Sequence, residues 1–178
     1  MDETRYANAG EEEYAILTEV RNKWFDHLQE ARIRILFDLK KRQSGKKLVL
    51  ARIYKTNDLI KHLTLSEKET DGTDLIIFLD KVCWDAIQRP EKIRIMRHEL
   101  RHVEVELGKK QPFVIVGHDI EDFVAEVKEN QDDVDWRRSV VELTSEIYQQ
   151  KEEEEKEAKK LAKGEGRGRR GSKVAKML

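Results

Sequence analysis

Apolar and polar positions in the first half of the chain follow a helical period and then a strand period. Residues 11 to about 30 place apolar side chains at helical spacing, which predicts an amphipathic helix. Residues 33–39 largely alternate and residues 48–56 carry a second apolar pattern, so both segments are predicted to be strands. The polar segment 43–46 is typical of a turn. We therefore expect a β-hairpin with the helix packed on it.

The middle of the chain predicts a buried strand. Residues 57–62 suit either a short helix or an irregular connection, and residues 66–72 form a polar loop. Residues 75–79 are an unbroken apolar run, which is typical of a largely buried strand.

A helix is then expected between Pro90 and Gly108, because proline is favoured in a first helical turn and glycine commonly follows a last one. His98 and His102 fall roughly opposite its apolar stripe on a helical wheel. The stripe consists of Met96, Leu100, Val103 and Leu107.

The remainder of the chain predicts a loop over 111–117, a helix over 118–130 and a final packed helix from 134 to about 150. Beyond Lys151 the apolar pattern ends.

The resulting organisation has one domain. We expect a flexible N-terminus at 1–10, a domain at 11–150 and a charged extension at 151–178. The extension would begin as a solvated helix, and residues 164–178 would form a disordered basic tail. The fold class is α+β, with a sheet of three or slightly more strands and flanking helices.

Composition adds compartment and partner expectations. Charged residues make up 40% of the chain and hydrophobic residues 38%, with a net charge of −1, so the whole chain has no bias toward nucleic acid or membranes. Cys83 is the single cysteine, which excludes an intramolecular disulfide. The N-terminus shows no secretory pattern, and no apolar run spans a bilayer. A soluble, cytoplasmic protein is expected, and its oligomeric state is open.

The segment His98-Glu99-Leu100-Arg101-His102 carries the candidate chemistry. Residues four apart on a helix lie about 40° apart, so both imidazoles can reach one metal ion. Glu99 could then take a proton from metal-bound water. The alternative is a pair of solvent-facing histidines, since Arg94 and Arg97, with Arg101, make one side of the helix hydrophilic.

A hydrolytic zinc site normally has three protein ligands, and His118 is our candidate for the third. Its competitors are carboxylates in the same segment, with two weaker candidates on the HExxH helix. Asp119 and Asp122 could instead hold a ligand imidazole by a hydrogen bond, or be ordinary acidic residues of a helix N-terminus. His27 and His62 are interpreted as surface residues. The competing carboxylates are Asp119, Glu121 and Asp122, and the weaker ones are Glu104 and Glu106.

HELRH, the later Gly117–Phe123 element and Trp136 resemble the putative phage metallopeptidase family, over roughly residues 30–137. The pattern is also similar to small zincins such as the SprT-like and Spartan proteases. The resemblance implies a zincin-like domain, zinc on three histidines, a catalytic base in the first motif and action inside a bacterial host. By that resemblance the ligands are His98, His102 and His118, and the base is Glu99. Arg101 departs from the apolar or small residue expected there.

Two functions follow as hypotheses. The first is zinc-dependent hydrolysis of peptide bonds with Glu99 as general base and a strand edge holding the polypeptide substrate. Arg101 and Tyr148 are the possible additional oxyanion donors. The alternative is a zincin-fold scaffold or nucleic-acid-associated protein with a structural or vestigial metal site. Its basic tail, which includes Arg167 and Arg170, could contact phosphates without sequence preference or could simply be a solubilising terminus.

Overall fold

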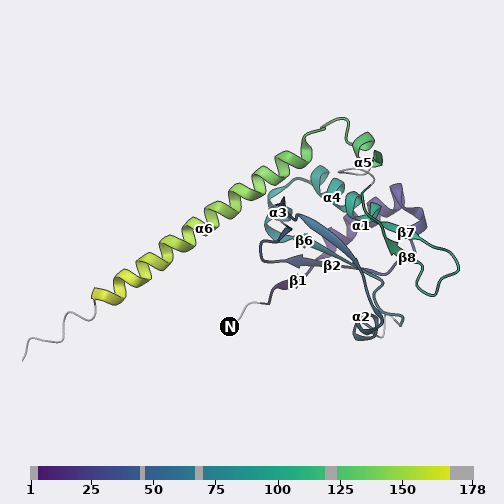
Figure 1. Ribbon diagram of the computed structural model, residues 1–178, viewed down its shortest axis with the longest axis horizontal. Coiled ribbons are helices and arrows are strands. Elements are labelled where there is room, and N and C mark those ends of the chain that lie inside the picture. The colour runs from purple at the N-terminus through teal and green to yellow at the C-terminus, as the bar shows by residue number, and fades with distance from the viewer. Residues whose placement is uncertain (1–3, 45–46, 67–69, 119–123, 169–178) are drawn as a thin grey trace, which may run out of the picture.

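The computed structural model describes residues 4–44, 47–66, 70–118 and 124–168, with side chains described up to residue 160. These residues form a mixed α+β domain from which one long helix projects (Figure 1). The strands are β1 (Tyr6–Asn8), β2 (Ile33–Asp38), β3 (Gln43–Ser44), β4 (Lys47–Leu48), β5 (Ala51–Lys55), β6 (Leu75–Asp80), β7 (Val103–Val105) and β8 (Phe113–Ile115). The helices are α1 (Glu11–Trp24), the 3₁₀ turn η1 (Asp26–Leu28), α2 (Asp58–Leu63), α3 (Lys81–Ala86), α4 (Arg89–Arg101), α5 (Val124–Glu129) and α6 (Trp136–Gly168).

The main sheet has four strands in the order β1-β2-β6-β5. Strand β6 lies at its centre, parallel to β2 and antiparallel to β5. Its apolar run explains this position, because alternate residues on one face are fully buried while the others are half-buried. Strand β1 lies within the first ten residues and adds an edge that the sequence pattern did not predict.

The predicted hairpin between the strands at 33–39 and 48–56 is wrong. Ile77 of β6 pairs with Ile35 of β2 on one side and with Ile53 of β5 on the other, so β6 separates the two strands. The chain between β5 and β6 includes α2, and it is long enough for β6 to insert between β2 and β5. Gln43 and Ser44, the first half of the turn predicted at 43–46, form the short strand β3, which pairs with β4, and residues 45–46 lie outside the described residues.

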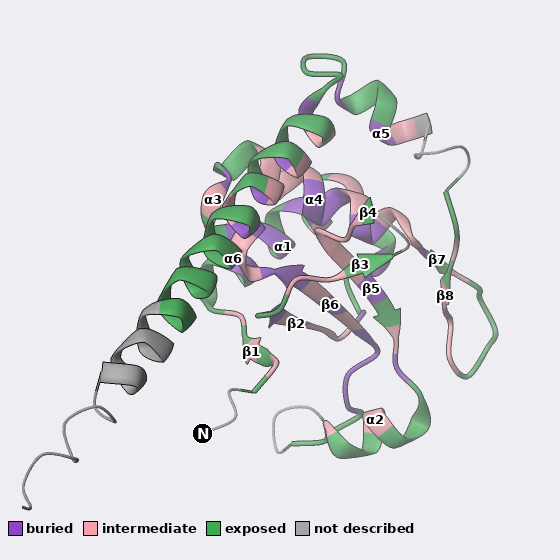
Figure 2. Ribbon diagram, turned by 60° about the vertical axis from the view of Figure 1, so that its left-hand side comes forward, coloured by how far each residue is buried: buried purple, intermediate pink, exposed green. Residues whose placement is uncertain are grey.

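The core lies between the sheet and helices α1, α3, α4 and the first turns of α6, where the ribbon in Figure 2 is coloured purple for buried residues. Met96 and Leu100 of α4 are fully buried, as the apolar stripe predicts. Trp84 of α3 is also buried, and its indole N–H donates a hydrogen bond to Glu13 of α1 at 2.9 Å. This bond between two helices fixes α3, which leads directly into α4.

Helix α4 ends earlier than the pattern predicts. His102 is its C-terminal cap, and the chain continues as β7, which pairs with β8 in the segment expected to be a loop. Val103 is therefore buried on a strand, whereas Leu107 is 91% exposed. Gly108, with φ of +84°, belongs to the hairpin turn between these strands and not to a helix end.

Helix α6 begins at Trp136 and continues to Gly168, well past the last apolar position. Tyr148 is buried and donates a 2.6 Å hydrogen bond to Asp80 at the end of β6, but residues 151–160 are exposed and extend away from the domain (Figure 2). Most of the predicted basic tail, residues 169–178, lies outside the described residues. No described helix is long and apolar enough to cross a membrane.

Candidate metal centre

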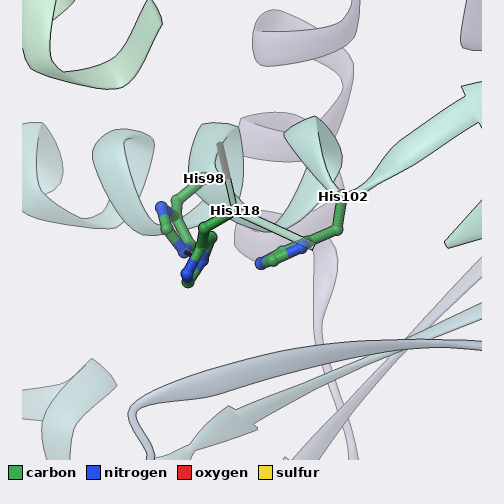
Figure 3. Close-up of side chains that lie close together, drawn as sticks. All are labelled: His98, His102 and His118. Carbon is green, nitrogen blue, oxygen red and sulfur yellow. Dashed lines mark hydrogen bonds between the residues drawn. The ribbon is translucent and has the colours of Figure 1, made fainter. Parts of the chain in front are cut away.

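Three histidines converge beside the C-terminal end of α4 (Figure 3). His98 lies on the last turn of α4, His102 caps it, and His118 follows strand β8. One ligand atom from each ring lies within 4.8 Å of those from the other two. They are the one group of three or more potential metal ligands found among the described residues.

The spacing of the rings fits a single metal ion. The Nε2 atoms of His98 and His118 are 3.1 Å apart. Two nitrogens that each lie about 2.0–2.1 Å from a tetrahedral zinc ion would be roughly 3.4 Å apart. The ring centroid of His102 lies 5.2 Å from that of His98 and 4.7 Å from that of His118. The donor set is therefore chemically and geometrically suited to a metal.

The β7–β8 hairpin brings His118 to the other two histidines. The backbone N–H of Val116 donates to the carbonyl of His102 at 2.8 Å. In addition, Nδ1 of His102 lies 2.7 Å from the carbonyl oxygen of Val116. Because that oxygen can only accept, Nδ1 carries the proton and Nε2 of His102 keeps its lone pair for a metal. The premature end of α4 is thus what allows the third histidine to approach.

Glu99 lies on α4 beside His98 and is 5% exposed. Burial raises the pKa of its carboxyl group to about 7, although the charges of His98 and Arg137 and a hydrogen bond from the backbone N–H of Ile53 lower it. Its side chain nevertheless lines a cavity that also reaches His98. Glu99 can therefore meet a ligand while it is shielded from bulk water.

Arg137 of α6 is a site residue that the sequence analysis did not identify. Its Nη2 atom lies 3.1 Å from Nδ1 of His98, and its side chain lines the same cavity as Glu99. Nothing in the local sequence marks it, because it follows His102 by 35 positions on a different helix. Its closeness is produced only by the packing of α6.

Arg97 and Arg101 are not on a solvent-facing side of α4, contrary to the expectation for that face. Arg97 is 4% exposed and donates from Nε to both carboxylate oxygens of Glu126 on α5, at 2.9 and 3.1 Å. Arg101 donates to the same carboxylate at 3.0 Å. The rings of Trp24 and Phe25 lie against the two guanidinium groups. The counter-charge and the rings explain why Arg97 can be buried and Arg101 partly buried here.

The other candidates lie elsewhere. Asp119, Glu121 and Asp122 are outside the described residues. Glu104 and Glu106 are exposed on and just after β7, not on a helix, and His27 and His62 are exposed, as expected. The hydroxyl of Tyr148 is directed to Asp80, and Arg101 to Glu126, so neither of these predicted oxyanion donors is seen at the histidines.

Comparison with known proteins adds a family. No curated protein and no solved structure matches the chain. The family model described as "Putative phage metallopeptidase" matches residues 5–144, which include every strand of the described residues, the three clustered histidines and the start of α6. The match covers most of the 178 residues. The chain therefore belongs to the putative phage metallopeptidase family.

Proposed function

We propose that the protein is a zinc-dependent peptidase with a zincin-like domain, in which His98, His102 and His118 hold the metal and Glu99 is the general base. The observation that carries this proposal is the convergence of three imidazoles beside a buried glutamate that lines a cavity. Family membership supports a metal-dependent reaction on a polypeptide.

Zinc is the proposed metal because of the donor set. Neutral imidazoles suit zinc better than magnesium or calcium, which prefer oxygen ligands. Three protein ligands also leave the fourth position that a hydrolytic site requires. When bound, zinc would acidify a water molecule and polarise the carbonyl of the scissile bond.

Glu99 is proposed to accept a proton from the attacking water on its carboxylate and to pass it to the leaving amine. Its burial favours this role, since a carboxylate in a water-poor site exchanges protons with a bound reactant and not with solvent. Arg137 contributes a fixed positive charge beside His98, where negative charge would develop on the carbonyl oxygen.

Strand β5 is the proposed support for the substrate backbone. It is an edge strand of the main sheet, and it lies beside α4. The carbonyl of Leu50 accepts from Asp80 of β6, whereas the N–H of Ile53 is directed to Glu99. The alternate backbone groups of β5 thus face the candidate site, where an extended peptide could pair with them.

The test combines metal analysis with two substitutions. Purified full-length protein should contain about one zinc per chain by mass spectrometry of the metal, and His118→Ala should lose most of it. Glu99→Gln should retain zinc but reduce peptide hydrolysis by about 10²-fold or more. Glu104→Gln, a change at an exposed glutamate on β7, is the matched control and should alter neither quantity.

Two results would overturn the proposal. Purified protein without stoichiometric metal, even after incubation with zinc, would remove the metal centre. Hydrolysis by Glu99→Gln at the rate of the unsubstituted protein would exclude Glu99 as the base.

A further inference from the structure

Two adjacent hollows open beside His98 and His118. The smaller is about 230 Å³ and is lined by both His98 and Glu99, and the larger is about 940 Å³ and reaches His118. They share the side chains of Leu48, Trp136, Arg137 and Val141. A ligand bound across both hollows would therefore pass directly beside the candidate metal centre.

The smaller hollow, here called the apolar pocket, suits a single side chain. Apart from His98, Glu99 and Arg137, all of its lining residues are apolar, with Leu50, Ile95 and Val141 among them. Its volume is below the roughly 300 Å³ at which sites for whole small-molecule ligands begin. Burial of one aliphatic or aromatic side chain there would contribute to binding next to the reacting groups.

The larger hollow, here called the basic groove, runs between the β3–β4 segment and α6 and carries positive charge. Lys41, Lys47 and Arg137 line it, and no carboxylate is among its described lining residues. Lys41 pairs with Glu152 at 3.4 Å, but both side chains are substantially solvated. Such exposed pairs are weak, so a carboxylate of a ligand can replace Glu152 at little cost.

We propose that this cleft selects polypeptide segments that place an apolar side chain beside the scissile bond and an acidic residue a few positions away, in the basic groove. This inference rests on the proposed peptidase function. Each residue of an extended peptide advances the chain by about 3.3 Å. Because the two hollows share lining residues, only a few residues would separate the apolar side chain in one from the acidic side chain in the other.

A polypeptide explains the cleft better than a single-stranded nucleic acid. Nucleic-acid grooves combine basic residues with exposed aromatic rings on which bases stack. The one aromatic residue that lines both hollows, Trp136, is only 5% exposed. An apolar pocket next to a basic groove instead matches a peptide with an apolar side chain and an acidic side chain a few positions away.

The test is a cleavage profile. Zinc-loaded full-length protein is incubated with a peptide library made from a bacterial proteome, and new termini are identified by mass spectrometry. Cleavage sites should be enriched in Leu, Ile, Met or Phe at one position next to the bond, and in Asp or Glu at a position two to five residues away on one side. The acidic preference should weaken at high salt.

Two variants separate the halves of the cleft. Lys41→Glu/Lys47→Glu should reduce cleavage of acidic peptides by roughly five- to tenfold and leave the apolar preference and zinc content unchanged. Val141→Trp should fill the apolar pocket and shift the preference toward Ala and Gly. Lys110→Glu, on the exposed β7–β8 turn, is the control and should leave the profile unchanged.

The outcomes distinguish this inference from the proposed function. If every peptide that the zinc-loaded protein cleaves is also cleaved by Glu99→Gln, or if no peptide is cleaved at all, the peptidase proposal fails. If it cleaves peptides with neither preference, or if Lys41→Glu/Lys47→Glu leaves the profile unchanged, the peptidase stands and the selectivity inference is wrong. If the double variant changes only binding of a single-stranded oligonucleotide, measured by fluorescence anisotropy, the groove is a nucleic-acid site and the inference is also wrong.

Discussion

Arg101, which lies inside the HELRH motif, donates a 3.0 Å hydrogen bond to Glu126 on α5, and the Glu126 side chain is completely buried. Arg97, one turn earlier, binds the same carboxylate, and Asn130 accepts from Arg97 at 2.6 Å. Helix α4 thus has two roles. It carries His98 and His102, and its arginines bind α5, the helix that follows His118 in the sequence. Arg101, which departs from the residue expected in the motif, therefore has a structural role.

Glu126→Ala should destabilise the protein by about 3–5 kcal/mol, because it leaves two arginines without their buried counter-charge. It should also weaken zinc binding, since α5 follows His118 closely in the sequence and its displacement would pull on that ligand. Chemical denaturation and a zinc competition titration measure the two effects. Arg101→Lys keeps the charge and should cost far less, so equal losses in both variants would contradict this account.

Gly72 and Gly108 both have positive φ, of +71° and +84°, but only Gly72 is crowded. A Cβ atom at Gly72 would overlap the backbone carbonyl of Lys61, whereas nothing lies within 4 Å of one at Gly108. Gly108→Ala should therefore cost about 1 kcal/mol from backbone strain alone, and Gly72→Ala roughly 2–4 kcal/mol or more. Denaturation midpoints compare the pair, and equal costs would show that the overlap is relieved.

Asp74 should give the protein an acid-sensitive component of stability. Burial raises its pKa, but hydrogen bonds from Arg32 and Lys61 outweigh burial and hold the pKa below its usual value of 3.8. A carboxyl group with a lowered pKa in the folded state contributes stability above its unfolded pKa and loses it as pH falls through the folded pKa. Asp74→Asn should therefore lower stability by about 1–3 kcal/mol at pH 7 and by less near pH 2.

Asp80 provides the opposite case. Burial raises its pKa despite the hydrogen bond from Tyr148. Its ionisation therefore opposes folding, and the favourable contribution of its protonated form is lost as pH rises through the folded pKa. As pH rises from 3 to 7, the stability of Asp80→Asn relative to the unsubstituted protein should therefore increase, whereas that of Asp74→Asn should decrease. Profiles of the same sign would contradict the two assignments.

The domain should fold without the end of α6. Tyr148 is the last buried side chain among the described residues, and residues 151–160 are exposed. A chain that ends at Gln150 should melt within about 2 °C of the full-length protein, since surface changes rarely exceed 0.5 kcal/mol. A chain that ends at Glu142 removes Tyr148 and buried Thr144 and should be strongly destabilised. Circular dichroism melts compare them.

Zinc should stabilise the folded protein, because the proposed ligands converge only when α4 and the β7–β8 hairpin are formed. Free zinc at about 100 times its dissociation constant should add about 2.7 kcal/mol, which raises the melting temperature by roughly 5–10 °C. His118→Ala should lose most of this increase. His62→Ala, at an exposed histidine of α2, should keep it.

The sequence predicted those features that depend on local patterns. The apolar run at 75–79 indicated a buried strand, and β6 is the central one. Pro90 and the stripe through Met96 and Leu100 indicated the motif helix, which is α4. The histidine spacing then placed His98 and His102 together, because a helix has a fixed period.

Features that depend on distant pairing were not predictable in this way. Gly108 is compatible with a helix end and with a hairpin turn, and only the pairing of β7 with β8 decides between them. Likewise, neighbouring strands usually form a hairpin, but here β6 takes the place between β2 and β5. Arg137 has no motif and reaches His98 only through the packing of α6.

The early end of α4 has a consequence for how this protein could diversify. Because His102 caps the helix and the hairpin returns at once, Glu99 and the three histidines all lie within residues 98–118. The walls of the cleft come mostly from two other segments, 41–51 and 134–149. The proposed catalytic residues and the proposed determinants of selectivity thus lie in separate stretches of the sequence, and Arg137 lines the cleft while it lies next to His98. Exchange of the wall segments between relatives would then be a route to new substrate preferences on an unchanged metal centre.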